Sequence, residues 1–180
     1  ENARMYARWS HKKNIEKIGK PVDKEEWGMS PQTVNAYFSP TNNEIVFPAA
    51  ILQPPFYDYK ADEAVNYGGI GAVIGHEISH GFDDSGSRYN AEGNLINWWS
   101  DEDLKQFTTL GSALADQYSA LEPLPGIFVD GKFTLGENIG DLGGVNAAFD
   151  GLQIYLKENG NPGLIDGFTP DQRFFISWAT

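Results

Sequence analysis

The stretch that decides the fold is His76-Glu77-Ile78-Ser79-His80, which lies inside a segment, residues 61–82, with helical periodicity despite its five glycines. Residues four apart lie one above the other on a helix, so both imidazoles can reach one ion at about 2.0–2.1 Å. Glu77 stands beside them, where its carboxylate can take a proton from an activated water. Two core histidines on an amphipathic helix would give the same short pattern, so the motif alone leaves a purely structural role open.

A tetrahedral catalytic metal site needs a third protein ligand and one open position. The chain has no cysteine, and its only other histidine, His11, lies far upstream in a charged segment. Glu137 and Asp141 are four residues apart on a second predicted helix, away from its apolar stripe. Glu137 is therefore a candidate ligand, and Asp141 is a candidate to hold a ligating imidazole by its second nitrogen.

Each acidic candidate also has an ordinary structural explanation. Glu137 follows Thr134 by three residues, which is the pattern of a helix capping box. The ordinary explanation for Asp141 is that it is a charged surface residue in contact with solvent. Asp83 follows His80 by three residues and shares its helix face, but Asp83-Asp84-Ser85-Gly86 is also typical of a turn. Spacing alone does not choose between these interpretations.

The rest of the pattern predicts an α+β chain that is mostly α-helical, with one short antiparallel β element. Strands are expected at residues 34–38 and 44–47, around the turn at 41–43. Further helices are expected over residues 1–18, from Ser100, from Thr134 and from Thr169-Pro170. Gly71 and Gly75 leave a bare helix face, which favours close packing of another element.

Composition excludes several classes of protein. The formal net charge is -12 and the chain has no lysine and arginine cluster, so a nucleic-acid partner is not expected. No apolar run reaches transmembrane length. Neither terminus looks like a natural chain end, so we expect residues 1–180 to be part of a catalytic domain, truncated at both ends.

Two blocks together carry a family resemblance. HEISHGFDD at residues 76–84 and GENIGDLGG at 136–144 resemble the paired signature of neprilysin-type (M13) zinc metalloendopeptidases. Residues 19–27, 35–38 and 47–56 are similar to further family blocks, in family order. In having no cysteine, the chain resembles the bacterial, endopeptidase O-like branch of the family. The resemblance implies a thermolysin-like (gluzincin) catalytic core with one Zn²⁺ per chain.

The resemblance also implies roles for individual residues. The zinc ligands would be His76, His80 and Glu137. The catalytic residues would be Glu77, as general base, and Asp141, which with Asp83 would orient the histidines. Asn35 and Ala36 would hold the substrate backbone along the edge of the short strand. Ile51, Phe56 and Val73 would line an apolar pocket for the residue after the scissile bond, although ordinary core packing explains those three equally well.

The chain departs from the family pattern in several places. Gly140 stands where the family usually has alanine, and Ala72 where some relatives carry methionine. The family's oxyanion-stabilising histidine and arginine would follow Trp178, beyond these residues, and Arg173 does not lie in the matching context. We therefore expect an endopeptidase for oligopeptides that has little activity as this chain alone.

Two alternatives remain at the level of sequence: a zinc-binding fragment without turnover, and a metal-free module that binds peptides. The resemblance implies the bacterial cell envelope or periplasm as the compartment, with the cytoplasm as the alternative. The sequence does not specify an oligomeric state.

Overall fold

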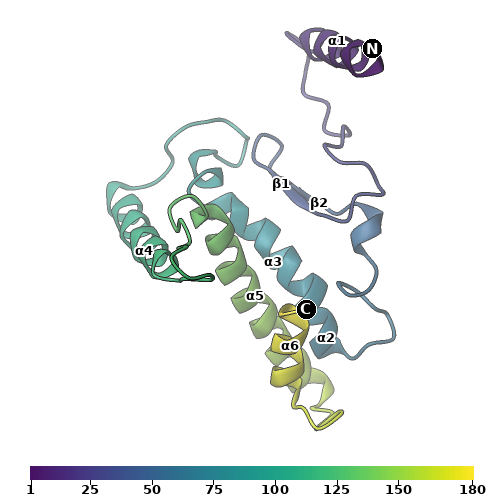
Figure 1. Ribbon diagram of the computed structural model, residues 1–180, viewed down its shortest axis with the longest axis vertical. Helices are drawn as coiled ribbons and strands as arrows, with labels where there is room; N and C mark the ends of the chain where they lie inside the picture. The colour runs from purple at the N-terminus through teal and green to yellow at the C-terminus, as the bar shows by residue number, and fades with distance from the viewer.

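The computed structural model describes all of residues 1–180 and confirms a mostly helical α+β chain with one two-stranded antiparallel sheet (Figure 1). The helices and strands are α1 Asn2–Ile15, β1 Tyr37–Ser39, β2 Glu44–Val46, α2 Glu63–Asn66, α3 Ala72–Ser79, α4 Asp101–Ser119, α5 Leu135–Asn159 and α6 Pro170–Trp178. Short helical turns are η1 Ala49–Ile51, η2 Tyr67–Gly71, η3 His80–Phe82 and η4 Gly86–Arg88.

The centre of the molecule is the pair α3 and α5, which lie side by side (Figure 1). They touch through glycine: a Cβ built on Gly75 would stand 2.8 Å from the Cα of Gly144. A Cβ on Gly71 would lie 3.7 Å from the methyl group of Ala148. The bare face predicted from Gly71 and Gly75 is therefore the face that packs on α5.

The helical periodicity of residues 61–82 comes from a stripe of isoleucines four residues apart, Ile70, Ile74 and Ile78, and this packing explains why the stripe is not the buried side of the helix. Ile70 is buried, but Ile74 and Ile78 are 39% and 51% exposed. The glycine and alanine face of α3 is turned toward α5, and the stripe is rotated away from it. The stripe of apolar residues thus predicted the helix correctly but did not predict which of its faces is buried.

The predicted helix over residues 61–82 is not one regular α-helix. The π-helical turn η2 separates α2 from α3. The backbone N–H of Ile70 donates to the carbonyl of Phe56 at 2.7 Å, outside the helix. Cβ atoms on Gly68 and Gly69 would collide with the carbonyl oxygens of Phe174 and Phe56. The glycines therefore let two other segments reach the helix backbone, at a point where the helical hydrogen bonding is irregular.

The main buried cluster lies at the α2, α5 and α6 end of the molecule and contains Phe174, Leu152, Ala148, Ala64 and Ala72. Helix α6 is fixed there by Arg173, which is 7% exposed. Its Nε donates to both carboxylate oxygens of Asp62, at 3.1 and 3.2 Å. Its Nη1 donates to the carbonyl of Phe168 at 2.6 Å. Residues 111 positions apart are thus joined by a buried ion pair.

The β element is shorter than predicted. Strand β1 begins at Tyr37 and pairs with β2 in the register Phe38 to Ile45. Asn35 and Ala36 precede the strand, so the prediction that they lie within it is wrong. The side chain of Asn35 accepts the N–H of Ala36 at 2.9 Å, which holds this backbone outside the ladder.

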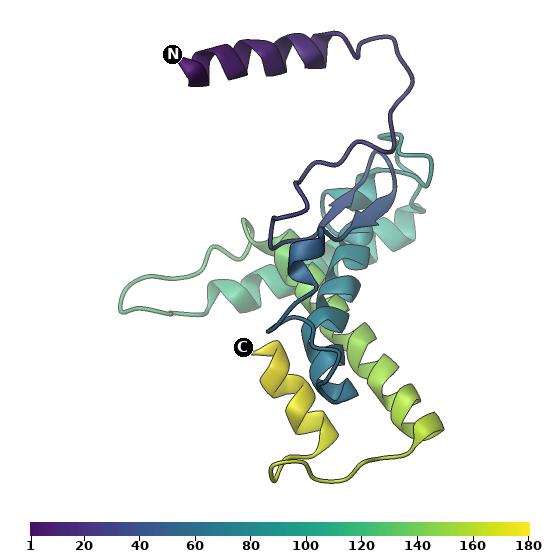
Figure 2. The ribbon, with the colours of Figure 1, turned by 90° about the vertical axis from the view of Figure 1, so that its right-hand side faces the viewer.

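Helix α1 stands apart from the remaining elements (Figure 2), and none of its residues is buried. Helices α4 and α6 begin where predicted: Ser100 accepts the N–H of Asp103, and Thr169 forms a capping box with Gln172. None of the helices is both long and apolar enough to cross a membrane.

Candidate metal centre

The two histidines of the HEISH stretch meet a carboxylate from α5. His76 lies in the last turn of α3 and His80 opens η3, with their rings edge to face at 4.5 Å between centroids. Oε2 of Glu137 lies 3.3 Å from Nε2 of His76 and 3.8 Å from Nε2 of His80. Potential ligand atoms of all three residues lie within 4.8 Å of one another.

This arrangement fits a zinc ion. Tetrahedral bonds of about 2.0–2.1 Å place ligand atoms about 3.3–3.4 Å apart, close to the spacings of the Glu137 oxygen from the two imidazole nitrogens. Two imidazoles and one carboxylate form a donor set used by catalytic zinc, with a fourth position left for water. The side chain of Glu137 is 71% exposed, so this side of the centre is open to solvent.

Each histidine is held by a second carboxylate through its other nitrogen. Nδ1 of His76 donates to Asp141 at 2.9 Å, and Nδ1 of His80 donates to Asp83 at 2.8 Å. These bonds fix the tautomer and leave the Nε2 lone pairs directed toward Glu137. The hydrogen bond to Asp141 raises the pKa of His76, and the bond to Asp83 raises the pKa of His80, each against an opposing effect of burial.

Asp83 satisfies both interpretations that the sequence left open. One carboxylate oxygen holds His80, while the other accepts the backbone N–H groups of Ser85 and Gly86 at 2.7 and 2.6 Å. Burial alone would raise the pKa of Asp83, but the hydrogen bonds from His80 and these two amides outweigh it and lower the pKa. The turn and the imidazole thus share one ionised carboxylate.

The capping-box explanation of Glu137 is wrong. Thr134 makes no side-chain cap to the helix backbone. Its hydroxyl donates to the carbonyl of Asp130 and accepts the side-chain amide of Asn138. Glu137 is thereby free to face His76 and His80. Asp141 is likewise not a merely solvated charge, because it hydrogen-bonds His76.

Glu77 lies between the two candidate ligand histidines in sequence and differs from the other acids of the centre. It is 5% exposed, and its Oε2 has no hydrogen-bond partner. Burial raises the pKa of Glu77, although His76 and His80 act in the opposite direction. A buried carboxylate with one unpartnered oxygen beside the candidate metal ligands is suited to exchanging a proton with a molecule in the cavity.

The centre opens into two adjoining cavities, of about 480 and 310 Å³, and both are lined by His76, Glu77 and Asn35. Ala36 lines the larger one. The predicted apolar pocket residues, Ile51, Phe56 and Val73, all line the smaller one. The structure therefore brings the predicted substrate residues to the metal centre, and their contact with a peptide stays a prediction.

Sequence reasoning missed residues that tertiary folding brings to these cavities. Tyr89 reaches the larger cavity from the loop after η4, and Trp178 reaches the smaller one from the end of α6. No local motif marks either residue. Their positions depend on how distant segments pack onto α3.

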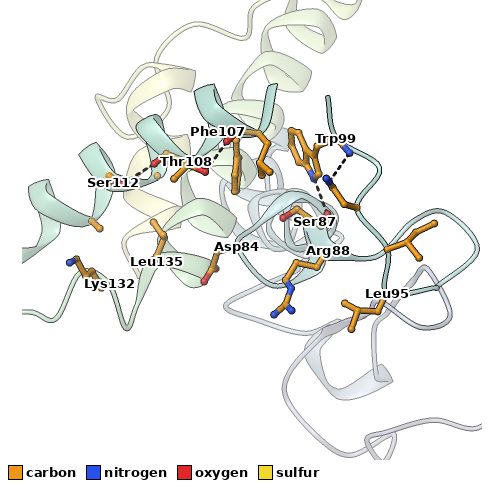
Figure 3. Close-up of a pocket in the computed structure, with 15 residues that line it drawn as sticks. Asp84, Ser87, Arg88, Leu95, Trp99, Phe107, Thr108, Ser112, Lys132 and Leu135 are labelled. Carbon is orange, nitrogen blue, oxygen red and sulfur yellow. Dashed lines mark hydrogen bonds between the residues drawn. The ribbon is translucent and has the colours of Figure 1, made fainter. Parts of the chain in front are cut away.

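A larger hollow of about 760 Å³ lies beside α4 and is separate from this centre (Figure 3). Its walls include Trp99, Phe107 and Leu135, with Arg88 and Lys132 among the charged lining residues. The group of residues able to hold a metal, His76, His80 and Glu137, lies outside its lining. Size alone would thus have placed the candidate site wrongly.

The sequence of the chain is similar to those of known proteins. The family model described as Peptidase family M13 matches residues 35–180. Neprilysin-11 of Caenorhabditis elegans is 49% identical over 95% of the chain, and human endothelin-converting enzyme 1 is 42% identical over 99%. The chain spans only 21% and 23% of these two relatives.

Two solved structures are similar. The crystal structure of the Mycobacterium tuberculosis zinc metalloprotease Zmp1, in complex with an inhibitor, gives a TM-score of 0.88 at 56% identity. The match covers 94% of this chain and 27% of that one. PepO from Lactobacillus rhamnosis gives a TM-score of 0.77 at 41% identity, over 90% and 24%. The expected metallopeptidase core fold is confirmed, and the chain belongs to peptidase family M13.

Proposed function

We propose that the protein is a zinc-dependent endopeptidase that hydrolyses peptide bonds of oligopeptides, with residues 1–180 forming part of its catalytic domain. The observation that carries the proposal is the convergence of His76, His80 and Glu137 beside the buried, unpartnered oxygen of Glu77. Membership of peptidase family M13 supports the reaction class.

Metal binding, orientation of the histidines and proton transfer are assigned to different residues of the centre. His76, His80 and Glu137 would hold the ion, and Asp141 and Asp83 keep both imidazoles in the ligating tautomer. The chemistry supplied by a bound zinc is acidification of water and polarisation of the peptide carbonyl. Oε2 of Glu77 accepts the proton of the attacking water and then delivers it to the leaving amine.

The substrate would lie in the two adjoining cavities. The segment with Asn35 and Ala36 is proposed to hold the peptide backbone, and Ile51, Phe56 and Val73 to receive the side chain after the scissile bond. A short, partly exposed β element next to the metal suits an extended peptide, which can pair with an exposed backbone edge.

The chain alone is expected to turn over slowly. Neither cavity is lined by a lysine or arginine. Arg173 is committed to Asp62 and Phe168 in the core, so it is not placed to act on substrate. Loss of one oxyanion donor typically costs about 10²–10³ in kcat. The whole protein's activity is therefore a separate measurement from that of these 180 residues.

Glu77→Gln tests the reaction directly. The variant removes the proton acceptor but no metal ligand, so zinc content should equal that of wild type while cleavage of a fluorogenic oligopeptide falls at least about 10²-fold. Glu158→Gln, an exposed position on α5, is the matched control and should leave both unchanged. Measurable cleavage by wild type that is equalled by Glu77→Gln would overturn the assignment of Glu77.

The same experiment separates the two alternatives. Zinc binding without any cleavage by wild type would favour a zinc-binding chain that has no turnover. Peptide binding by a chain that takes up no zinc would favour a metal-free binding module.

We also infer that the whole protein works in a bacterial cell envelope or periplasm, with the cytoplasm as the alternative. This rests on the family resemblance. Fractionation of the native host followed by immunoblotting should find the protein in the envelope or periplasmic fraction. Its recovery in the cytoplasmic fraction would contradict the inference.

A further inference from the structure

The smaller cavity beside the metal centre is lined by segments that are far apart in the chain. Ile51 comes from η1, Phe56 from the turn that follows it, and Val73 from α3. The end of α6 adds Ser177 and Trp178. Trp178 has the largest apolar side chain in the lining and is 47% exposed, whereas Ile51 is only 2% exposed. An entering side chain would therefore cover apolar surface of Trp178 that the chain itself leaves open to solvent.

The position of this tryptophan is fixed by contacts of α6 with α2 and η2, which lie beside it (Figure 1). The hydroxyl of Ser177, the residue before Trp178, donates to the carbonyl of Val65 at 2.8 Å. The carbonyl oxygen of Phe174, a fully buried residue, lies where a Cβ on Gly68 would be placed. Since α2 and η2 lead directly into α3, the indole and the candidate metal ligands are held by one set of packed helices.

We propose that Trp178 is a specificity-determining residue that selects an aromatic side chain over a small one at the position after the scissile bond. This inference rests on the proposed peptidase function and adds a residue to its smaller cavity. The charged side chains of the lining are two acids, Glu77 and Asp141, and no lysine or arginine is present. An acidic substrate side chain would enter this cavity without a cation to pair with, so the lining suits an apolar one.

The sizes of the cavity and of the indole contact set the expected preference. At about 310 Å³ the cavity is small for a ligand site, so it has room for one side chain and not for a longer segment. Paired aromatic rings bind more tightly than burial of their surface alone predicts, by about 2–10-fold for one pair. Truncation of Trp178 also removes the apolar wall itself, so the preference for phenylalanine over alanine should fall about tenfold.

The test measures the binding of two fluorescein-labelled hexapeptides of glycine, alanine and serine that differ at one position, which holds phenylalanine in one and alanine in the other. Fluorescence anisotropy gives both dissociation constants for the zinc-loaded 180-residue chain carrying Glu77→Gln, so that neither peptide is cleaved during the measurement. The quantity compared is the ratio of the two constants. Zinc content and the circular dichroism spectrum are recorded for every variant.

Three further substitutions are made in that chain. Trp178→Ala should lower the preference for the phenylalanine peptide about tenfold at unchanged zinc content, and Trp178→Phe, which keeps an aromatic ring, should retain most of it. Trp9→Ala is the matched control, because Trp9 is an exposed tryptophan on α1, which stands apart from the cavity. Its ratio should equal that of the chain with Glu77→Gln alone.

An unchanged ratio in Trp178→Ala would overturn the proposal. So would an equal loss of affinity for both peptides, because the indole would then support the fold without selecting a side chain. A ratio in Trp178→Phe as low as in Trp178→Ala would overturn the aromatic contact. If the chain with Trp178 intact prefers neither peptide, the proposal fails as well, and its zinc content then shows whether the metal centre survives that failure or fails too.

Discussion

At the scale of single residues, each acid of the centre has a defined task, and Asp83 has a second one, because it also accepts the amides of the turn that follows. Glu137 faces both Nε2 atoms, Asp141 and Asp83 hold the Nδ1 atoms, and Glu77 keeps an unpartnered oxygen. The helical spacing of His76, Glu77 and His80 could be predicted from the sequence, because i and i+4 contacts are local. The sequence could not predict whether Glu137 caps its own helix or faces the two histidines, because that depends on which helix packs opposite.

Removing the partner of His76 tests this division of tasks. In Asp141→Ala, the imidazole is no longer held in one tautomer, so zinc affinity should fall about 10–100-fold while all three ligands remain. Chelator competition measures the change, with Asp150→Ala on the same helix as the control. An Asp141→Ala variant with wild-type affinity would show that the hydrogen bond at 2.9 Å does not orient the ligand.

At the scale of elements, the metal centre depends on the close approach of α3 and α5. The periodicity of both helices was evident in the sequence, and so was the bare face at Gly71 and Gly75. The covered face of α3 was not evident, since Ile74 and Ile78 remain largely exposed. The periodicity of apolar residues indicates that a segment is helical. Which face of that helix becomes buried depends on a partner far away in the chain. The same limit applies to Tyr89 and Trp178, which reach the cavities only through tertiary packing.

The link between α6 and α2 gives a prediction at this scale. Asp62→Ala leaves Arg173 charged and buried, and it also removes the side chain that caps α2. Breaking a buried pair in this way typically costs about 3–5 kcal/mol, so the free energy of unfolding should fall by about that amount. Urea unfolding followed by circular dichroism measures it, with Asp150→Ala, at an exposed position on α5, as control. A loss below about 1 kcal/mol would show that the pair contributes little to holding α6.

At the scale of the whole molecule, the family, the mostly helical fold and the short antiparallel pair all followed from the sequence, and the exact ends of the strands did not. The chain is small beside its relatives, spanning about a fifth to a quarter of their length. Only 25 of its 180 residues are buried, so its own core is modest for its size. A bound ion that joins α3, η3 and α5 should therefore stabilise it measurably.

Zinc should raise the melting temperature of the chain, because a ligand that binds only the folded state stabilises it by mass action. At 100 times the dissociation constant the gain is about 2.7 kcal/mol. Differential scanning fluorimetry with added zinc, and again after removal of zinc by a chelator, measures the shift. Melting that is independent of zinc would contradict a site joining these elements.

The zinc content of the purified chain, measured by elemental analysis for wild type, Glu137→Ala and Glu158→Ala, tests the three-ligand centre more directly than any other measurement. We expect one zinc per chain in wild type and in Glu158→Ala, and loss or strong weakening of binding in Glu137→Ala. A wild-type chain that takes up no zinc in the presence of excess metal, or a Glu137→Ala chain that binds as wild type does, would contradict the three-ligand centre of His76, His80 and Glu137.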